Sequence, residues 1–502
     1  MPVSMATKLC ATTAPEMDPV AIEKDGNEKK QQEQEYEMEY RKHEWPSLYS
    51  NPDFLVLYVS DDGNMTLIRP ADTLEHRKAM EKQQGHYALS HLWGNAKDYP
   101  YWEVGDFIQD WDGAPVEPIP MRPEKRNTLL ALLKAYPGYW WIDVLCARVD
   151  TPLVIMGSIY RSCKTCFALL DCSIETIHRL SKRHLLPTRN DIFTTLLTLY
   201  KAMLKAANDD LDESSAFNLV SPAAGAYLEK LMSYQDEIQA MRDLLGCRWF
   251  SRIWTLQELV LPTKLVILTE SYQDNEDVDI HQDQAEFDII NDVINVLQIE
   301  EFVDYLDDAT RMVYEREHVP MVEWLAQKRD SCLEGPYICS EDLTMVARLD
   351  QIQDVFDSLA GSPRTCMDPL DYVYGILGLL NLNIPRLDNA DHLWRTFLSQ
   401  LEDRLAQMVN DITAEDVHVS FTLSASAHDI KLNEAKNVSE VYNGLLTLDF
   451  DERALAIVLK DSEKRARMAP HPDSVEDLAI SNELCDIIDS LSDVLTKKAT
   501  VG

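Results

Sequence analysis

Strand-like patterns open the folded part of the chain. Residues 54–59 and 65–68 are β-prone, and the sequence SDDGN between them is rich in turn-forming residues, which predicts a β-hairpin. Three later runs are mainly apolar, at 87–92, 139–146 and 165–170. Such continuity is typical of strands that are covered on both faces, as in a parallel sheet.

Helical patterns separate these strands. Asn127 is placed to cap a short helix over 127–135, and residues 155–161 also have helical spacing. The order strand, helix, strand, helix, strand predicts an α/β fold, in which a parallel sheet carries helices on both faces. Residues 172–246 interrupt this alternation with long helical patterns, and we interpret them as a helical insertion.

The stretch 247–269 predicts a helix, a tight turn and a buried strand. Its apolar residues recur every three to four positions between Trp249 and Leu261, Ser251 is placed to cap the helix, and Pro262 must end it. The run LVIL at 265–268 then has the composition of a short strand. The alternation of strand and helix therefore resumes after the insertion.

Glu258 is the candidate for chemistry within this stretch. It lies four residues after Trp254, so a helix presents the carboxylate and the indole on one side. A carboxylate beside a sugar can stabilise an oxocarbenium-like centre, and an indole can stack on a flat heterocycle. The structural alternative is a capping box formed by Thr255 and Glu258, although a helix that starts at Thr255 would be very short.

Several polar or small residues follow the predicted strands at their carboxyl ends, where a parallel sheet forms its ligand crevice. They are Ser90, His91, Trp93 and Gly94 after the first strand, Cys146 and Arg148 after the second, and Asp171 after the third. We expect them to share one rim, with the alternative that Ser90 and Gly94 only shape a turn and Trp93 only covers the core. Asp143, within the second strand, can meet Arg148 or Arg161 as a buried pair, which would stabilise the fold little and would not indicate catalysis.

The cysteine residues raise two further possibilities. Cys163 and Cys166, with Cys172 nearby, have the spacing of a zinc or redox pair, but no second pair lies at zinc-finger spacing, and buried free thiols are the favoured interpretation. Cys146 is a conceivable nucleophile without an obvious base partner. The acidic run 274–288 lacks the glycine of a calcium loop, so we expect no metal site.

Composition narrows the choice of partners. The 502 residues carry a formal net charge of −38, which repels phosphate backbones and anionic lipid, so we expect neither nucleic acid nor membrane as a partner. Only 16 glycines occur, and none forms a phosphate-binding glycine motif. Residues 1–45 lack the apolar core of a secretory signal, no stretch has the length of a membrane span, and the ten cysteines are unevenly spaced. We therefore expect a cytoplasmic protein.

The outer regions carry no recognisable chemistry. Residues 1–48 are polar and are predicted to be disordered or loosely helical. Helical patterns dominate 287–329 and 342–359, and Asp368 is placed to cap a further helix. Residues 381–502 are acidic and mostly helical by pattern.

Five segments together resemble the fungal heterokaryon-incompatibility (HET) domain. They are YALSHLWG at 87–94, WWIDVLCA at 140–147, MGSIYRSC at 156–163, WFSRIWTLQELVL at 249–261 and MDPLDYVYGILGL at 367–379. The resemblance implies a HET domain over 50–380 with a TIR-like, flavodoxin-like core at about 87–270. It also implies a role in fungal self/non-self recognition, in which the domain self-associates, contacts other proteins and triggers cell death.

The residue pattern formed by Ser251, Trp254 and Glu258 is similar to the pattern in the helix of those TIR domains whose glutamate cleaves NAD. By that resemblance Glu258 is the catalytic carboxylate, and NAD is a substrate rather than a bound cofactor. The nucleotide-binding residues implied are Ser90, His91, Trp93, Gly94, Asp143, Arg252 and Trp254.

The chain departs from the family pattern at two places. Ala147, Arg148 and Val149 follow Cys146 where the family usually has isoleucine, asparagine and glutamine, and His91 replaces the usual tyrosine. If the missing amides touch the ligand, activity is weakened. Two hypotheses therefore stand, an NAD-cleaving signalling protein and a catalytically inactive scaffold, while a metal-dependent hydrolase would need ligands that converge near Cys163 and Cys166.

Overall fold

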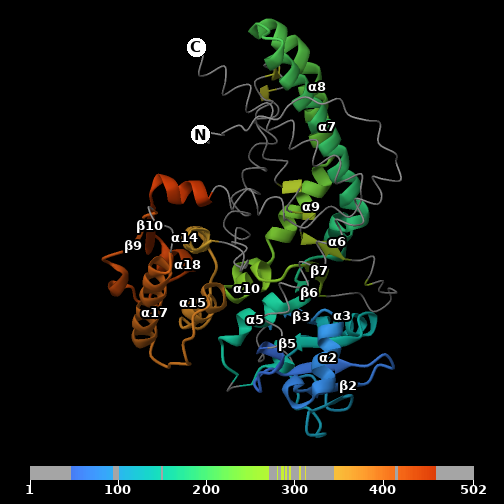
Figure 1. Cartoon of the computed structure of the whole chain (residues 1–502). Coiled ribbons are helices and arrows are strands. Elements are labelled where there is room, and N and C mark those ends of the chain that lie inside the picture. Colours follow the sequence, from blue (N-terminus) through green and yellow to red (C-terminus); the bar gives the residue numbers. More distant parts are fainter. Residues whose placement is uncertain are drawn as a thin grey trace, which may run out of the picture.

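The computed structural model describes residues 47–93, 101–148, 151–270, 344–412 and 417–458, together with short stretches between 280 and 312. At the centre of the described part lies an eight-stranded sheet with the order β4-β2-β1-β5-β3-β6-β7-β8 (Figure 1). Four neighbouring strands in it run parallel, namely β3 (His86–His91), β5 (Gly138–Ile142), β6 (Cys163–Leu170) and β7 (Leu265–Thr269). The expected α/β class is confirmed.

The order of the parallel strands locates the edge where ligands bind in such folds. Along the chain β3, β5, β6 and β7 come first to fourth, and across the sheet they stand in the order second, first, third, fourth. This is the flavodoxin-like arrangement, whose strand order reverses between β3 and β6. The carboxyl ends of these two strands, at His91 and Leu170, therefore mark the switch point of the sheet.

The predicted hairpin is confirmed and extends the sheet. β1 (Val56–Val59) and β2 (Met65–Ile68) pair antiparallel, and β1 also pairs antiparallel with β5. The short strands β4 (Ile108–Gln109) and β8 (Ala285–Glu286) complete the two edges. β5 is buried at every position, which explains why its sequence shows no polar alternation.

Two expected boundaries around β5 are wrong. Helix α3 (Pro123–Ala135) begins four residues before the predicted cap Asn127, because Pro123 suits the first helical turn, where its missing N–H is not needed. The strand ends at Ile142, and residues 143–146 form a single helical turn, α4 (Asp143–Cys146). Asp143 Oδ1 accepts the backbone N–H of Val144 at 2.7 Å, which favours leaving the strand at this point.

The remaining helices of this part follow the predicted pattern, except α2 (Leu74–Lys82), which was not predicted from the sequence. Helix α5 (Ile155–Ser162) lies between β5 and β6, and α2 follows the hairpin. The interruption after β6 is helical throughout, with α6 (Ile174–Leu180), α7 (Lys182–Asn208), α8 (Glu213–Ser233) and α9 (Gln235–Leu245). In Figure 1, α7 and α8 form a long hairpin that rises away from the sheet.

The stretch after the insertion differs from its prediction at one end. A 3-10 turn, η2 (Arg248–Ser251), precedes the helix α10 (Trp254–Val260), and no side chain caps that helix. Ser251 is therefore not a cap; its hydroxyl donates to the carbonyl of Arg248 at 2.6 Å. The other end is confirmed, since α10 stops before Pro262 and β7 follows.

The C-terminal region is helical, as expected, with one small sheet that the sequence did not predict. Its helices are α14 (Met345–Gly361), α15 (Asp371–Tyr374), α16 (Leu377–Leu380), α17 (Ala390–Asn410) and α18 (Val438–Tyr442). β9 (Val419–Leu423) and β10 (Leu446–Phe450) pair antiparallel beside them. Figure 1 places α10 between the central sheet and this region.

Several predictions fall outside the described residues. These are Gly94, Val149, the N-terminal residues 1–46, most of the acidic run 274–288 and of the segment 287–329, and residues 459–502. The limits of the three predicted domains remain predictions. Within the part of the chain that the structure describes, no helix combines the length and the apolar character that crossing a membrane requires.

Candidate functional site

Helix α10 brings Glu258 to the carboxyl end of β3. The hydroxyl of Ser90 donates a short hydrogen bond to Glu258 Oε2, and Trp249 Nε1 donates to the same hydroxyl at 2.7 Å. All three side chains are buried, with exposed fractions of 1% for Ser90 and 8% for Glu258. The sheet and the helix after the insertion thus meet at the switch point.

The capping-box alternative for Glu258 is wrong. The hydroxyl of Thr255 donates to the carbonyls of Trp249, at 2.6 Å, and Arg252, at 2.8 Å, and does not cap the helix. Glu258 itself bonds to a side chain of the sheet. Its position is therefore not explained by the local chemistry of the helix end.

Burial controls the protonation of Glu258. Its pKa is raised to about 7: loss of water and the nearby charge of Asp143 raise the pKa, and they outweigh the Ser90 hydrogen bond and the positive charge of Arg252, which lower it. The buried phenol of Tyr160 lies close to the same carboxylate, and burial together with the charge of Glu258 raises the pKa of the phenol. A carboxyl group with a pKa near neutrality can serve both as acid and as base.

Asp143 meets His91 and Trp93, whereas Arg148 pairs with Asp110 at 3.5 Å rather than with Asp143. His91 Nε2 lies 3.0 Å from Asp143 Oδ1, and the indole N–H of Trp93 donates to Oδ2. Burial raises the pKa of Asp143, but the hydrogen bonds and charge from these partners outweigh it and hold the pKa below its ordinary value.

His91 is a neutral link between a cation and an anion. Its pKa is lowered, chiefly by burial, so the ring donates one N–H, and its partners assign that proton to Nε2, which faces Asp143. Lys125 Nζ then lies 3.3 Å from Nδ1 and also donates to the carbonyl of Leu92.

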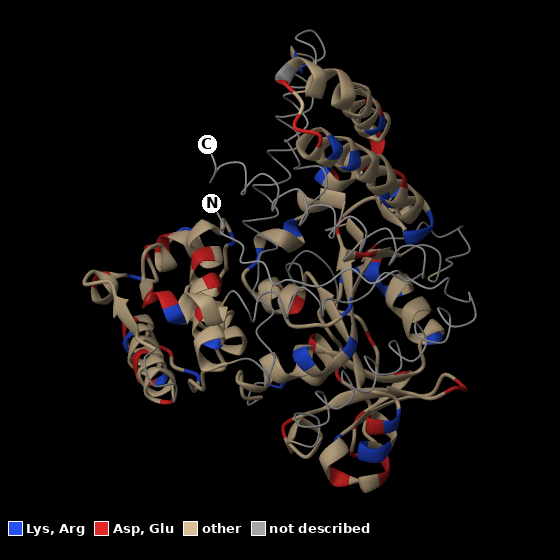
Figure 2. Cartoon of the chain, turned by 45° about the horizontal axis from the view of Figure 1, so that its top comes forward, with Lys and Arg blue, Asp and Glu red and all other residues tan. Residues whose placement is uncertain are grey.

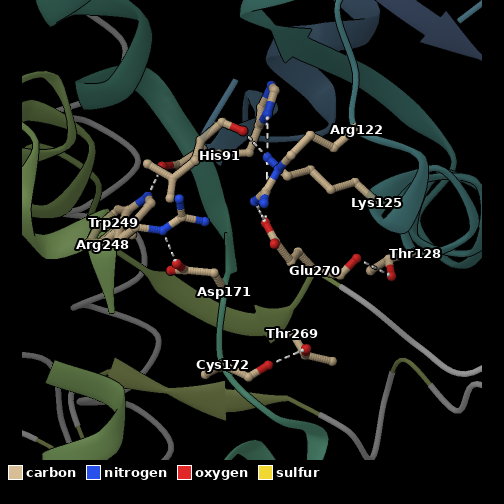
Figure 3. Close-up of polar contacts among 12 residues, drawn as sticks. His91, Arg122, Lys125, Thr128, Asp171, Cys172, Arg248, Trp249, Thr269 and Glu270 are labelled. Atoms are coloured by element: carbon tan, nitrogen blue, oxygen red, sulfur yellow. Dashed lines mark hydrogen bonds and ion pairs between the residues drawn. The ribbon is translucent and has the colours of Figure 1, made fainter. Parts of the chain in front are cut away.

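Lys125, Glu270 and Arg122 continue this network, and the sequence did not predict them (Figure 3). Lys125 Nζ lies 3.6 Å from Glu270 Oε2, and Arg122 Nη2 contacts the same oxygen. Burial lowers the pKa of Lys125 to about 8 and raises that of Glu270. Glu270 directly follows β7, so the strand-end argument applied to Ser90 would have found it, whereas Lys125 lies within a helix and gave no signal.

Three further residues that the sequence singled out, Asp171, Trp254 and Arg252, lie in two different places. Asp171, after β6, pairs with Arg248 at 2.6 Å beside this network (Figure 3). Trp254 hydrogen bonds the carboxyl of Asp371, so its indole is engaged away from the Ser90 contact of Glu258. Arg252 lowers the pKa of both Glu258 and Asp371 through its charge.

The comparison with protein families places this site within a known domain. Residues 86–258 match the family described as heterokaryon incompatibility protein (HET), about a third of the chain. Over these residues the chain is similar to the HET domain. The match begins with β3 and ends at Glu258, and it supports a role related to heterokaryon incompatibility. The comparisons with curated proteins and with solved structures found no match.

The cysteines of the HET domain do not add a second site. Burial raises the pKa of Cys146 to about 12, so its thiol is a poor nucleophile. Cys163 Sγ contacts the carbonyl of Tyr160 at 3.0 Å, and both Cys163 and Cys166 are buried free thiols, as favoured above. Among the residues that the structure describes, no three His, Cys, Asp or Glu side chains lie together as metal ligands would.

Proposed function

We propose that this HET domain cleaves the nicotinamide–ribose bond of NAD, with Glu258 as the catalytic carboxylate, and that this reaction drives heterokaryon-incompatibility cell death. The observation that carries the proposal is the hydrogen bond between Ser90 and Glu258 at the switch point of a flavodoxin-like sheet. Nucleotides bind at this edge in folds of this order. A TIR-like core, self-association on activation and a cytoplasmic location belong to the same proposal.

The chemistry needs a carboxylate that is ionised when substrate is bound. Departure of neutral nicotinamide leaves positive charge on the ribose, which the ionised Glu258 stabilises. Water then adds to the ribose and releases one proton, giving ADP-ribose. Because the pKa of Glu258 is raised to about 7, half of the carboxyl groups are ionised near neutral pH.

The neighbouring residues have supporting roles in this proposal. Ser90 and Trp249 hold the carboxylate in one orientation. Trp93, with 42% of its surface exposed, offers a ring on which a heterocycle can stack, and Asp143 fixes that ring by its indole N–H.

Release of nicotinamide from NAD by the purified full chain tests the proposal. Glu258→Gln keeps the size and the Ser90 contact but cannot ionise, so turnover should fall about 100-fold or more. Glu402→Gln, an exposed glutamate in α17, is the matched control and should leave turnover unchanged. Wild-type turnover should also rise between pH 6 and 8 as Glu258 ionises. Undiminished turnover in Glu258→Gln would exclude the assigned role.

The second candidate is a catalytically inactive signalling scaffold. One observation favours it, namely that only 8% of Glu258 is exposed. A scaffold would release no nicotinamide even at concentrations that force self-association, and Glu258→Gln would leave cell death intact in a fungal host. Loss of both nicotinamide release and cell death in that variant would favour the enzyme.

A further inference from the structure

The helix that carries Glu258 is held from outside the segment that matches the HET family. Strand-like backbone bonds join its entry to residue 365: Ile253 N–H donates to the carbonyl of Thr365 at 3.1 Å, and Thr365 N–H donates to the carbonyl of Ser251 at 2.7 Å. The family match ends at residue 258. More than a hundred residues therefore separate α10 from the segment that fixes its start.

Arg364 supplies a second hold on the start of α10. It is completely buried, and its Nη1 donates to the carbonyl of Arg252 and to the hydroxyl of Thr255, both at 2.7 Å. No side chain caps α10, and the bonds from Arg364 instead fix the carbonyl that precedes the helix and the hydroxyl of its second residue.

Gln257 supplies the third hold, directly beside Glu258. Its side chain is 1% exposed, and its amide donates to the carbonyl of Gly375 at 2.6 Å and reaches that of Tyr374 at 3.5 Å. On the other side it abuts Gly378, where an added Cβ would lie 2.0 Å from Gln257 Oε1. The amide is thus enclosed by the segment that forms α15 and α16.

A helix of this length needs such support. α10 has only seven residues, fewer than an isolated helix requires to be stable in water, so its position depends on its packing partners. It contacts α5 and η2, it bonds Ser90 of the sheet through Glu258, and residues 364–378 supply hydrogen bonds at its start and beside Glu258.

We propose that residues 364–378 form a clamp on α10, and that Arg364 and Gln257 are positioning residues that hold the Glu258 carboxylate against Ser90. This inference rests on the proposed function for its catalytic consequence.

Two variants test the clamp. Gln257→Met keeps the length of the side chain but removes both of its donor bonds. Arg364→Met removes the bonds at the start of α10. Arg364→Lys retains a donor and should therefore restore part of the activity that Arg364→Met loses. Tyr374→Phe is the matched control, because its hydroxyl bonds Leu387 and Pro385 and not α10. Thermal unfolding of each variant verifies that it is folded.

The expected kinetic result is a fall in kcat of about 10- to 100-fold with KM unchanged in Gln257→Met and Arg364→Met, because a small misplacement of a catalytic group is costly. The second readout is independent of activity. The infrared band of the protonated Glu258 carboxyl, identified by difference from Glu258→Gln, should titrate at lower pH in both variants as water reaches the group.

The two readouts separate the clamp from the proposed function. If wild type releases no nicotinamide but the Glu258 titration shifts in the two variants and not in Tyr374→Phe, the clamp stands and the NAD proposal falls. If titration and kcat in Gln257→Met and Arg364→Met match those of Tyr374→Phe, the clamp is overturned.

Discussion

At the scale of single residues, the burial of Glu258 sets the pH dependence of stability as well as the proposed chemistry. Its folded pKa is raised to about 7 from an ordinary value of 4.5. The folded state therefore binds more protons than the unfolded state between these values. Stability contributed by the protonated group is present below about pH 4.5 and is lost as the pH rises through 7.

Glu258→Gln should be more stable than wild type in alkaline solution. The amide keeps a contact with Ser90 but has no charge to bury, so the gain at pH 8 should reach up to about 3 kcal/mol and vanish near pH 4. Urea denaturation at both pH values measures it, with Glu402→Gln as a control that should show no pH-dependent difference. An equal change in stability at pH 4 and pH 8 would contradict the raised pKa.

The chemistry of single residues also explains which contacts at the rim could not be predicted from the sequence. Strand ends predicted the positions of Ser90, His91 and Asp171, because a parallel sheet collects them at one edge. The partners of Asp143 and Glu270 were beyond prediction, since they depend on side-chain direction and on helix α3, whose Lys125 is buried against expectation for a lysine.

At the scale of elements, α5 and α16 pack closely together and join the C-terminal region to the parallel core. Gly157 and Gly378 face each other there, and a Cβ built on Gly157 would lie 2.6 Å from the Cα of Gly378. Arg161 of α5 adds a hydrogen bond to the carbonyl of Gly378 at 3.2 Å. Both glycines are needed for close packing rather than for an unusual backbone conformation.

Gly157→Ala should therefore destabilise the protein by about 1 to 3 kcal/mol, because the methyl group must push two backbones apart. The matched control is Gly225→Ala within α8, where an added Cβ meets nothing within 4 Å and the better helix former should stabilise by roughly 0.5 to 1 kcal/mol. Urea denaturation of both variants tests the pair. A neutral Gly157→Ala would show that the helices can separate without cost.

Among the helices and strands, some could be predicted from the sequence and others could not. The hairpin β1–β2 and the strands β3, β6 and β7 were predictable because continuous apolar runs and turn residues are local signals. The start of α10 was not. Ser251 has the residue type of a helix cap. However, the start of α10 is held by hydrogen bonds with Arg364 and Thr365, which lie more than a hundred residues further along the chain and give no local sequence signal.

At the scale of the whole molecule, charge is distributed without a dominant patch on the drawn elements. Acidic and basic positions are mixed over the described ribbon in Figure 2, although the full chain carries a net charge of −38. At the candidate site, Arg122 and Lys125 are matched by Glu270, and Arg248 by Asp171. An anionic nucleotide would therefore meet cations at the rim only by competing with these carboxylates.

The arrangement of the whole molecule predicts that the family-matched segment does not fold alone. A fragment of residues 86–258 lacks β1 and β7, which flank β5 and β6 in the sheet, and would expose both as apolar edge strands. It also lacks the partners of α10 at residues 364–378. Circular dichroism and urea denaturation should show no cooperative transition for this fragment, whereas a fragment of residues 47–458 should unfold cooperatively. A cooperative transition in the short fragment would mean that the hairpin and the C-terminal region are accessories rather than parts of one core.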